Sequence, residues 1–268
     1  MQRFTDQTGR TILMPPGPPR RIVSLVPSQT ELLFDLGLRD ELCGITKFCV
    51  HPPEWFQSKK RIGGTKTVDG HKVAALRPDL ILANKEENEA AQVLELAAQF
   101  PVWISDIVSL ASALDMIRAV GALTGKAPEG AHLARQIEQA FAAQHRPEGQ
   151  PRRKAAYFIW RKPYLVAAAD TFIDTMLREA GFDNVFGERR RYPEIDLAAL
   201  AAAQPDCILL SSEPFPFAEK HFGPFREACP KAQIRVVDGE LFSWYGSRLL
   251  QSPAYFQKLR ESLDLAVL

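Results

Sequence analysis

The feature that most constrains the fold is a pattern that occurs once in each half of the chain. Residues 74–82 read Ala-Ala-Leu-Arg-Pro-Asp-Leu-Ile-Leu, and residues 198–209 run from Ala-Ala-Leu to Pro-Asp-Cys-Ile-Leu. In both, an alanine-rich helical stretch ends near Pro-Asp and leads into an apolar strand. Two comparable α/β lobes explain the repetition. The alternative also stays open that Pro-Asp before a strand is ordinary loop chemistry.

Short apolar runs rich in β-branched residues predict the strands of the two lobes. Helical spacing between them, as in 89–100 and 110–123, predicts an α/β fold with central, mostly parallel sheets and a ligand cleft between the lobes. We expect an N-terminal lobe over 1–126, a bridging helix over 127–147 and a C-terminal lobe over 148–268, separated after that helix by a polar break at 148–153. The predicted strands are 21–26, 42–46, 79–84, 102–105, 155–160, 206–211 and 234–237.

Local signals mark the ends of several elements. Residues 3–13 read as a hairpin. Ser28-Gln-Thr-Glu31 matches a capping box at a helix start, and Gly37 suits the left-handed position after the helix. In the second half, Asp170-Thr171 opens a helix that Gly181 ends.

Composition excludes some classes of function. The 33 Lys and Arg nearly cancel the 32 Asp and Glu, so a net charge of +1 gives no reason to expect nucleic acid or acidic lipid as a partner. The longest apolar runs fall far short of the roughly 20 residues that a membrane span needs. The start of the chain has no basic segment followed by an apolar core, so it shows no secretion signal.

The four cysteines do not form a CxxC pair, which argues against zinc ribbons and thioredoxin-like chemistry. They are Cys43, Cys49, Cys207 and Cys229. Ordinary buried thiols are one interpretation. A disulfide between Cys207 and Cys229 is the other, if the protein is exported.

Aromatic side chains gather in loops that follow predicted strands, where open α/β sheets bind ligands. A large flat ligand needs broad apolar faces, and rigid rings supply them at low entropic cost. The alternative for any single ring is core packing. The candidate residues are Phe48, His51, Trp160, Tyr164, Phe215, Phe217, Phe242, Trp244 and Tyr245.

Four cations are candidates for anionic groups of a ligand, namely Lys66, Lys85, Arg161 and Arg248. A solvated surface is the alternative for each.

Asp69 and His71 lie two residues apart, but the five histidines form no HxH or HxxxH pair, so we expect no metal site and no cofactor. No GxSxG, HExxH, GxxxxGK[ST] or GxGxxG motif is present, and we assign no catalytic residue. We therefore expect a binding protein and not an enzyme.

Several segments together resemble a known family. They are 21–32 (Arg-Ile-Val-Ser-Leu-Val-Pro-Ser-Gln-Thr-Glu-Leu), Leu-Gly-Leu at 36–38, Arg-Ile-Gly-Gly at 61–64, Arg-Pro-Asp-Leu-Ile-Leu at 77–82 and Gly-Phe-Asp-Asn-Val at 181–185. This sequence is similar to the cobalamin- and ferric-siderophore-binding proteins of ABC importers, also called helical-backbone metal receptors. The cobalamin-binding branch is the nearest likeness.

The resemblance implies a fold and a set of roles. It implies two lobes bridged by one long helix, here Pro128–Arg146, and a monomer that delivers cobalamin, a ferric siderophore or another metal chelate to an ABC transporter permease. It places the Pro27-Ser28 turn against the ligand and makes Asn84 a pocket position. It makes exposed glutamates dock onto the transporter, with Glu89 and Glu219 as the candidates.

The resemblance also implies a periplasmic location, whereas the chain is cytoplasmic if Met1 is the natural start. Two alternatives stay open. One is an enzyme that handles tetrapyrroles or metal chelates on the same fold. The other is a cytoplasmic sensor derived from it.

Overall fold

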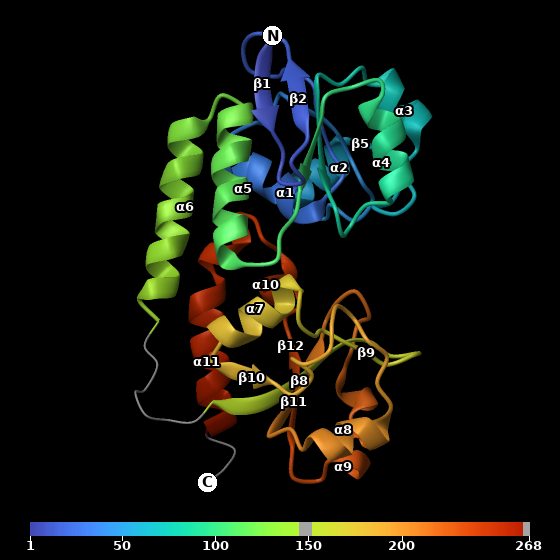
Figure 1. The fold of residues 1–268 in the computed structure, drawn as a ribbon, viewed down its shortest axis with the longest axis vertical. Helices are drawn as coiled ribbons and strands as arrows, with labels where there is room; N and C mark the ends of the chain where they lie inside the picture. The colour runs from blue at the N-terminus through green and yellow to red at the C-terminus, as the bar shows by residue number, and fades with distance from the viewer. Residues whose placement is uncertain (145–151, 265–268) are drawn as a thin grey trace. The chain divides into compact units, whose positions relative to one another are not determined.

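A computed structural model of the protein describes residues 1–144 and 152–264 (Figure 1). Contacts within the chain divide it into two compact units. Unit 1 comprises Met1–Ile107, Ala111–Glu138 and Tyr245–Arg248. Unit 2 comprises Val108–Leu110, Gln139–Trp244 and Leu249–Leu268. The predicted domain limits follow the chain without interruption, whereas each unit includes a short segment from elsewhere in the sequence.

Among the described residues, unit 1 holds a five-stranded parallel sheet with the strand order β5-β4-β3-β6-β7. Ile22 of β3 lies opposite Leu42 and Leu80 of its two neighbours. Strands β3, β6 and β7 are buried on both faces, which explains why their sequences are continuous apolar runs. The elements are β3 (Ile22–Ser24), α1 (Pro27–Asp35), β4 (Leu42–Ile45), α2 (Pro53–Ser58), β5 (Lys60–Arg61), α3 (Gly70–Ala75), β6 (Leu80–Asn84), α4 (Ala90–Ala97), β7 (Val102–Ser105), α5 (Leu110–Leu123) and α6 (Ala127–Ala142).

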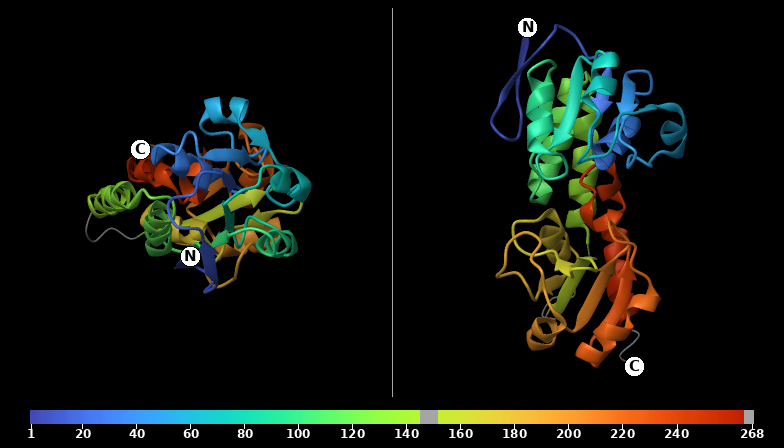
Figure 2. Two further views of the ribbon diagram at one scale, coloured as in Figure 1. Left: turned by 90° about the horizontal axis from the view of Figure 1, so that it is seen from above. Right: turned by 90° about the vertical axis from the view of Figure 1, so that its right-hand side faces the viewer.

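The predicted hairpin is confirmed as β1 (Gln2–Thr5) paired antiparallel with β2 (Thr11–Met14). It lies beside β7, the edge strand of the unit 1 sheet (Figure 2). The Gln7 amide donates to the Ile104 carbonyl at 3.1 Å, and the Trp103 indole donates to the Thr5 carbonyl at 3.3 Å. The hairpin thereby covers an edge that is otherwise open to pairing.

Unit 2 repeats the strand order of unit 1. Within the described residues its parallel strands run β10-β8-β11-β12, and β9 pairs antiparallel with β8. Strand β3 is flanked by β4 and β6, and β8 is flanked by β10 and β11, so β8 corresponds to β3. The short edge strand β5 of unit 1 has no counterpart among the described parallel strands of unit 2. The elements are β8 (Arg153–Trp160), β9 (Leu165–Val166), α7 (Phe172–Glu179), β10 (Phe182–Asn184), α8 (Leu197–Ala203), β11 (Cys207–Ser211), η1 (Glu219–His221), α9 (Gly223–Ala228), β12 (Gln233–Val237), α10 (Glu240–Ser243), η2 (Ser247–Leu250) and α11 (Ser252–Asp264).

The aspartate of the repeated Pro-Asp pattern accepts backbone hydrogen bonds in the same way in both units. The Asp79 carboxylate accepts hydrogen bonds from the amides of Arg20 and Arg21, both at 2.8 Å. The Asp206 carboxylate accepts from the Lys154 amide at 2.7 Å. In each unit, the aspartate before β6 or β11 therefore joins that strand to the start of its neighbour, β3 or β8.

The helix before each of these aspartates also begins in the same way. The Asp69 carboxylate accepts from the Lys72 amide and caps α3, and the Asp196 carboxylate accepts from the Ala199 amide and caps α8. The Lys72 amide holds the pKa of Asp69 below its usual value. Asp69, two residues before His71 in the sequence, is therefore the cap of helix α3.

The predicted capping box at Ser28–Glu31 is wrong. Helix α1 begins at Pro27 after Val26, without a side-chain cap. Proline suits the first helical position because its missing N–H would have no partner there. This start moves Ser28 into the first turn. Glu31 instead pairs with Arg248, far away in the sequence.

The helix predicted at Pro128–Arg146 is α6, which begins at Ala127 and ends at Ala142. Positions 145 and 146, and most of the predicted polar break at 148–153, lie outside the described residues. Contacts assign α6 to unit 1 up to Glu138 and to unit 2 from Gln139. The predicted helix-ending glycines, Gly37 and Gly181, both have the positive φ that this position requires (78° and 87°).

The four cysteines are free thiols, so the alternative of a Cys207–Cys229 disulfide is not realised. The Cys49 thiol is buried in unit 1 next to the hydroxyls of Thr30 and Thr46. Burial raises its pKa to about 11. Burial likewise raises the pKa of Cys207 to about 12. Both are therefore protonated packing residues near neutral pH.

In the part of the chain that the structure describes, no helix is long and apolar enough to span a bilayer.

Candidate ligand-binding site

Parallel strands place the loops that follow them on one edge of a sheet, and this edge is where α/β proteins bind ligands. We call it the carboxyl-end edge. In unit 1 it is formed by the loops after β3, β4, β5, β6 and β7, and in unit 2 by those after β8, β10, β11 and β12. Most of the predicted ligand-binding residues lie in these loops or at the strand and helix ends that border them, whereas Phe242, Trp244, Tyr245 and Arg248 lie in or after α10.

In unit 1, Asn84 at the end of β6 shapes the loop that follows. Its side-chain oxygen accepts from the amides of Glu86 (2.8 Å) and Glu87 (2.9 Å), and its amide nitrogen donates to the Ser105 hydroxyl at 3.0 Å. The side chain is almost fully buried. Asn84 was predicted as a pocket residue, and the structure gives it a scaffolding role.

Asn88, four residues further on, ties this loop to two others. Its side-chain oxygen accepts from the Asn84 amide at 2.8 Å. Its amide nitrogen donates to the carbonyls of Leu25 (3.3 Å) and Thr65 (3.0 Å). Three loops of the carboxyl-end edge therefore meet at one buried side chain. The sequence analysis did not single out Asn88.

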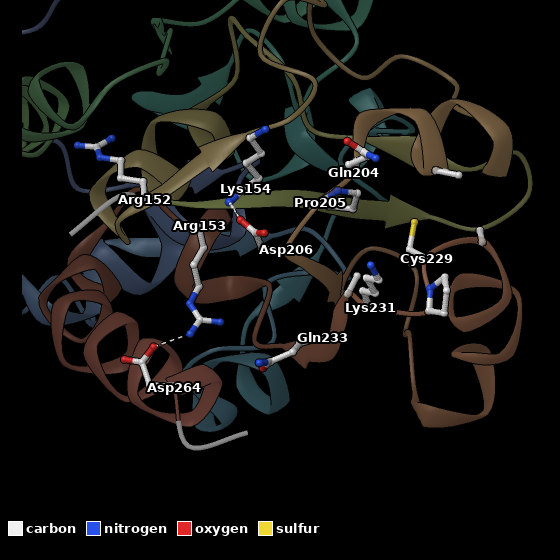
Figure 3. A pocket seen from close by; sticks show the side chains of 14 residues that line it. Arg152, Arg153, Lys154, Gln204, Pro205, Asp206, Cys229, Lys231, Gln233 and Asp264 are labelled. Carbon is white, nitrogen blue, oxygen red and sulfur yellow. Dashed lines mark hydrogen bonds and ion pairs between the residues drawn. The ribbon is translucent and has the colours of Figure 1, made fainter. Parts of the chain in front are cut away.

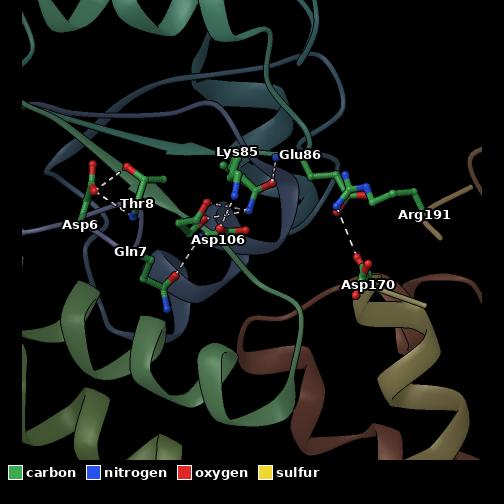
Figure 4. A network of polar contacts seen from close by, with 10 residues as sticks. Asp6, Gln7, Thr8, Lys85, Glu86, Asp106, Asp170 and Arg191 are labelled. Carbon is green, nitrogen blue, oxygen red and sulfur yellow. Dashed lines mark hydrogen bonds and ion pairs between the residues drawn. The ribbon is translucent and has the colours of Figure 1, made fainter. Parts of the chain in front are cut away.

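Two predicted anion-binding lysines of unit 1 have partners within the unit. The Lys66 ammonium donates to the carbonyl oxygens of Glu86 (2.6 Å) and Asn88 (3.3 Å). The Lys85 ammonium lies 2.6 Å from an Asp106 carboxylate oxygen, close to the hairpin turn where Asp6 and Thr8 are bonded to one another (Figure 4). Both lysines are exposed, so their ion pairs and hydrogen bonds are of the weak, solvated kind.

The segment Tyr245–Arg248 belongs to unit 1 although its neighbours on both sides belong to unit 2. The Tyr245 hydroxyl donates to the Glu87 carboxylate at 2.6 Å. The Arg248 guanidinium makes two bonds with the Glu31 carboxylate, at 2.5 and 2.8 Å, and the two side chains are only 12% and 15% exposed. Both residues were predicted to touch ligand, and both have carboxylate partners inside unit 1.

The Pro27-Ser28 turn is buried beneath this segment. A side chain at position 246 would meet the Ser28 carbonyl oxygen at 2.4 Å, so Gly246 permits a backbone contact that no other residue allows. The turn was predicted to face the ligand, and in this structure the 245–248 segment packs on it.

The exposed candidates of unit 1 are few. Phe48, in the loop after β4, is 50% exposed, and the Lys47 ammonium lies 5.1 Å from its ring centroid. His51 in the same loop is half-buried. Glu89, the docking candidate, is exposed immediately before α4.

The carboxyl-end edge of unit 2 presents aromatic side chains. Trp160, at the end of β8, is 39% exposed, and its ring centroid lies 5.8 Å from that of Phe215 in an edge-to-face arrangement. Tyr164, half-buried in the loop after β8, packs on Phe158 of the core at 5.8 Å. Arg161 beside them is half-buried. The role of these rings in ligand binding stays a prediction.

The other predicted aromatic residues of unit 2 are buried. Phe217 joins the core cluster with Phe225. Phe242 is completely buried and packs on Tyr157 and Phe256, at centroid distances of 5.1 and 4.7 Å. Phe242 thus realises the core-packing alternative.

The half-buried Glu213 orients Trp244, the second tryptophan among the predicted ligand-binding residues. One Glu213 oxygen accepts from the Trp244 indole at 3.1 Å and from the Ser243 hydroxyl at 2.6 Å. Burial raises the pKa of Glu213, with the Glu240 charge adding to the effect, while the two hydrogen bonds oppose it. Trp244 is itself buried. Glu219, the second docking candidate, is exposed at the start of η1.

A cavity of about 1030 Å³ in unit 2 lies at the other edge of the sheet, where β8, β11 and β12 begin (Figure 3). Its charged walls are partly neutralised, because Arg153 pairs with Asp264 at 2.6 Å. It contains none of the predicted ligand-binding residues, and charged, ion-paired walls suit a flat apolar ligand poorly. Among the described residues, no group of three or more His, Cys, Asp or Glu is placed to hold a metal ion.

Two α/β units with related parallel sheets define a two-unit class of α/β fold. Residues 22–226 match the periplasmic binding protein family, and the chain belongs to that family. A family of binding proteins agrees with the expectation that this chain is not an enzyme.

Relatives and solved structures support the same assignment. The vitamin B12-binding protein of Vibrio cholerae serotype O1 is 27% identical over 206 residues, covering 75% of this chain and 74% of that protein. The crystal structure of a periplasmic vitamin B12-binding protein of Vibrio cholerae matches with a TM-score of 0.78 at 21% identity, covering 92% and 98% of the two chains. An apo periplasmic haem-binding protein from Roseiflexus sp. RS-1 matches with a TM-score of 0.77 at 22% identity, covering 91% and 97%.

Proposed function

We propose that this protein is the substrate-binding component of an ABC importer and that it reversibly binds cobalamin, a ferric siderophore or another metal chelate. The observation that carries the proposal is the exposed Trp160 ring, which packs against the half-buried Phe215 ring at the carboxyl-end edge of unit 2. Family membership supports the binding role, and the similarity to vitamin B12-binding proteins supports the ligand class.

The chemistry of the loops favours a ligand with a large apolar face. Edge-to-face rings expose flat surfaces that a macrocycle or chelate can cover, and they lose little entropy when they do. Phe48 offers a similar surface on unit 1. Lys85 and Arg248 already have carboxylate partners, so recognition rests on the rings more than on these cations.

The ligand is tested by titration of the purified full chain with cyanocobalamin, haemin and ferric desferrioxamine. Quenching of tryptophan fluorescence and isothermal calorimetry are the two measurements. We expect saturable binding of at least one probe and an unchanged ligand spectrum over hours of incubation. A chain that binds none of the three contradicts the proposal, and a product with a new spectrum favours the enzyme alternative.

We also propose that the chain acts outside the cytoplasmic membrane and docks on a transporter permease through exposed acidic residues. Glu89 on unit 1 and Glu219 on unit 2 are the candidates. Exposed charges contribute mainly to the rate and orientation of encounter, so their reversal should reduce association without changing ligand affinity.

The docking proposal predicts that Glu89→Arg and Glu219→Arg lower ligand uptake by producing cells while the dissociation constant of the ligand stays the same. Glu95→Arg, which changes an exposed glutamate within α4, is the matched control and should leave uptake unchanged. Equal loss of uptake in all three variants argues against specific docking. Fractionation of producing cells tests the location.

A further inference from the structure

Asn88 is the side chain through which the carboxyl-end edge of unit 1 holds its loops together. Its three hydrogen bonds reach Asn84, Leu25 and Thr65, which lie in or beside three different loops. The side chain is almost completely buried, so these bonds do not compete with water. A single amide therefore sets the spacing of loops that are distant in the sequence.

The residues adjacent to these three contacts are ligand-site candidates. Leu25 precedes the Pro27-Ser28 turn, Thr65 precedes Lys66, and Asn84 precedes Lys85. A change of a few tenths of an ångström at Asn88 would be passed on to each of these loops, because their backbones bond directly to its amide group.

We propose that Asn88 is a positioning residue for ligand binding, which orders the carboxyl-end loops of unit 1 without touching the ligand. The proposal rests on the proposed function, since it assigns a role within the same binding site. It is specific to the amide group: one oxygen must accept from a backbone N–H while one NH2 group donates to two carbonyl oxygens.

Asn88→Asp is the sharpest test, because the shape is kept and only the donor is changed. The ionised carboxylate still accepts from the Asn84 amide, but it faces the Leu25 and Thr65 carbonyl oxygens, which repel it. Burial and this repulsion favour the protonated acid, which regains one donor. The Lys66 ammonium, bonded to the Asn88 carbonyl, favours ionisation, whereas the Glu86 and Glu87 carboxylates in the same loop oppose it.

The experiment measures the dissociation constant of whichever of cyanocobalamin, haemin and ferric desferrioxamine the unmodified chain binds, from pH 8 to pH 5. Asn88→Asp should weaken binding about tenfold at pH 8, and the deficit relative to the unmodified chain should shrink as the pH falls. Gln233→Glu is the matched control, an amide-to-acid change in a half-buried residue at the start of β12. It should leave the affinity unchanged at every pH.

Hydrogen exchange of the full chain without ligand separates the two proposals. Asn88→Asp should speed exchange at amides in the loops after β3 and β5 at pH 8, and Gln233→Glu should not. Unchanged exchange in these loops, or an affinity equal to that of the unmodified chain at pH 8, overturns the positioning role. Absence of binding by the unmodified chain to all three probes overturns the proposed function instead.

Discussion

The two units share a strand order but fill their carboxyl-end edges with different chemistry. In unit 1, the edge is built from amides and charged groups whose bonds run between loops, such as Asn88 to Leu25 and Arg248 to Glu31. In unit 2, the edge is built from rings that pack on their neighbours, such as Trp160 on Phe215. The same scaffold thus supports a polar, cross-linked surface in one unit and an aromatic surface in the other.

Because of this difference, substitutions at the two edges should have different effects. A buried polar group destabilises the fold when its partner is lost, because the remaining group stays desolvated without compensation. An exposed ring loses contact area when it is removed but leaves no unsatisfied group behind. We therefore expect loss of a buried ion-pair partner in unit 1 to reduce stability most, and loss of an exposed ring in unit 2 to reduce ligand affinity with little effect on stability.

The largest expected effect is the loss of the pair between Arg248 and Glu31. Arg248→Ala leaves the Glu31 carboxylate without its bidentate partner in a site that is mostly closed to water. We expect the free energy of unfolding to fall by about 3 kcal/mol, as measured by urea denaturation. Arg118→Ala is the control, since Arg118 pairs with Asp115 at the surface, and it should cost less than about 1 kcal/mol. Similar losses in both variants would show that burial of the pair is unimportant.

The second effect separates binding from stability. Trp160→Ala should weaken ligand binding about tenfold while changing the free energy of unfolding by less than about 1 kcal/mol, because the ring is partly exposed and leaves no buried gap. Phe48→Ala is its counterpart on unit 1 and should have a smaller effect on affinity, since that ring is not backed by a second aromatic residue in its loop. Calorimetry with whichever of the three probes the unmodified chain binds measures the affinity of both variants. A larger loss for Phe48→Ala would reverse the comparison between the two edges.

The smallest effect concerns the buried carboxylate that holds Trp244. Because burial raises the pKa of Glu213 above its unfolded value of 4.5, ionisation costs stability at neutral pH, and this cost disappears as the pH falls through the folded pKa towards 4.5. Glu213→Gln keeps an acceptor oxygen for Ser243 and Trp244. It should therefore add about 1 kcal/mol at pH 8, and the gain should vanish on acidification.

Asp69→Asn provides the contrast in unit 1. The pKa of Asp69 is lowered, so its stabilising contribution is present above 3.8 and is lost only at lower pH. Between pH 8 and pH 5 this substitution should have a constant effect on the melting temperature. A gain for Glu213→Gln that does not depend on pH would mean that folding does not raise the pKa of Glu213.

Much of the fold was predictable because its signals are local. The strands at 42–46, 102–105 and 206–211 appear as short apolar runs, and the structure places β4, β7 and β11 there. The repeated Pro-Asp pattern predicted two related units, and the two aspartates join β6 to β3 and β11 to β8. The sequence also singled out Trp160, which ends a predicted strand, and Phe215, which follows another, although their contact with one another was not predicted.

The residues that organise unit 1 were not predictable in the same way. Asn88 looks like any polar residue before a helix, and its role depends on Leu25 and Thr65, which are 63 and 23 residues away. Glu31 fits a capping box, and only Arg248, 217 residues further on, shows its actual partner. Phe242 has the loop context of a ligand-binding ring, yet it packs into the core of unit 2.

The sequence alone determined the α/β class, the two-fold repetition and the family, since all three rest on short segments that can each be recognised without knowing which other segments they contact. The tertiary structure alone decided which polar groups are structural and which side chains remain available to a ligand. The physical reason is that burial and hydrogen-bond partnership are set by chain segments far apart in sequence. No local pattern records which of those segments will meet.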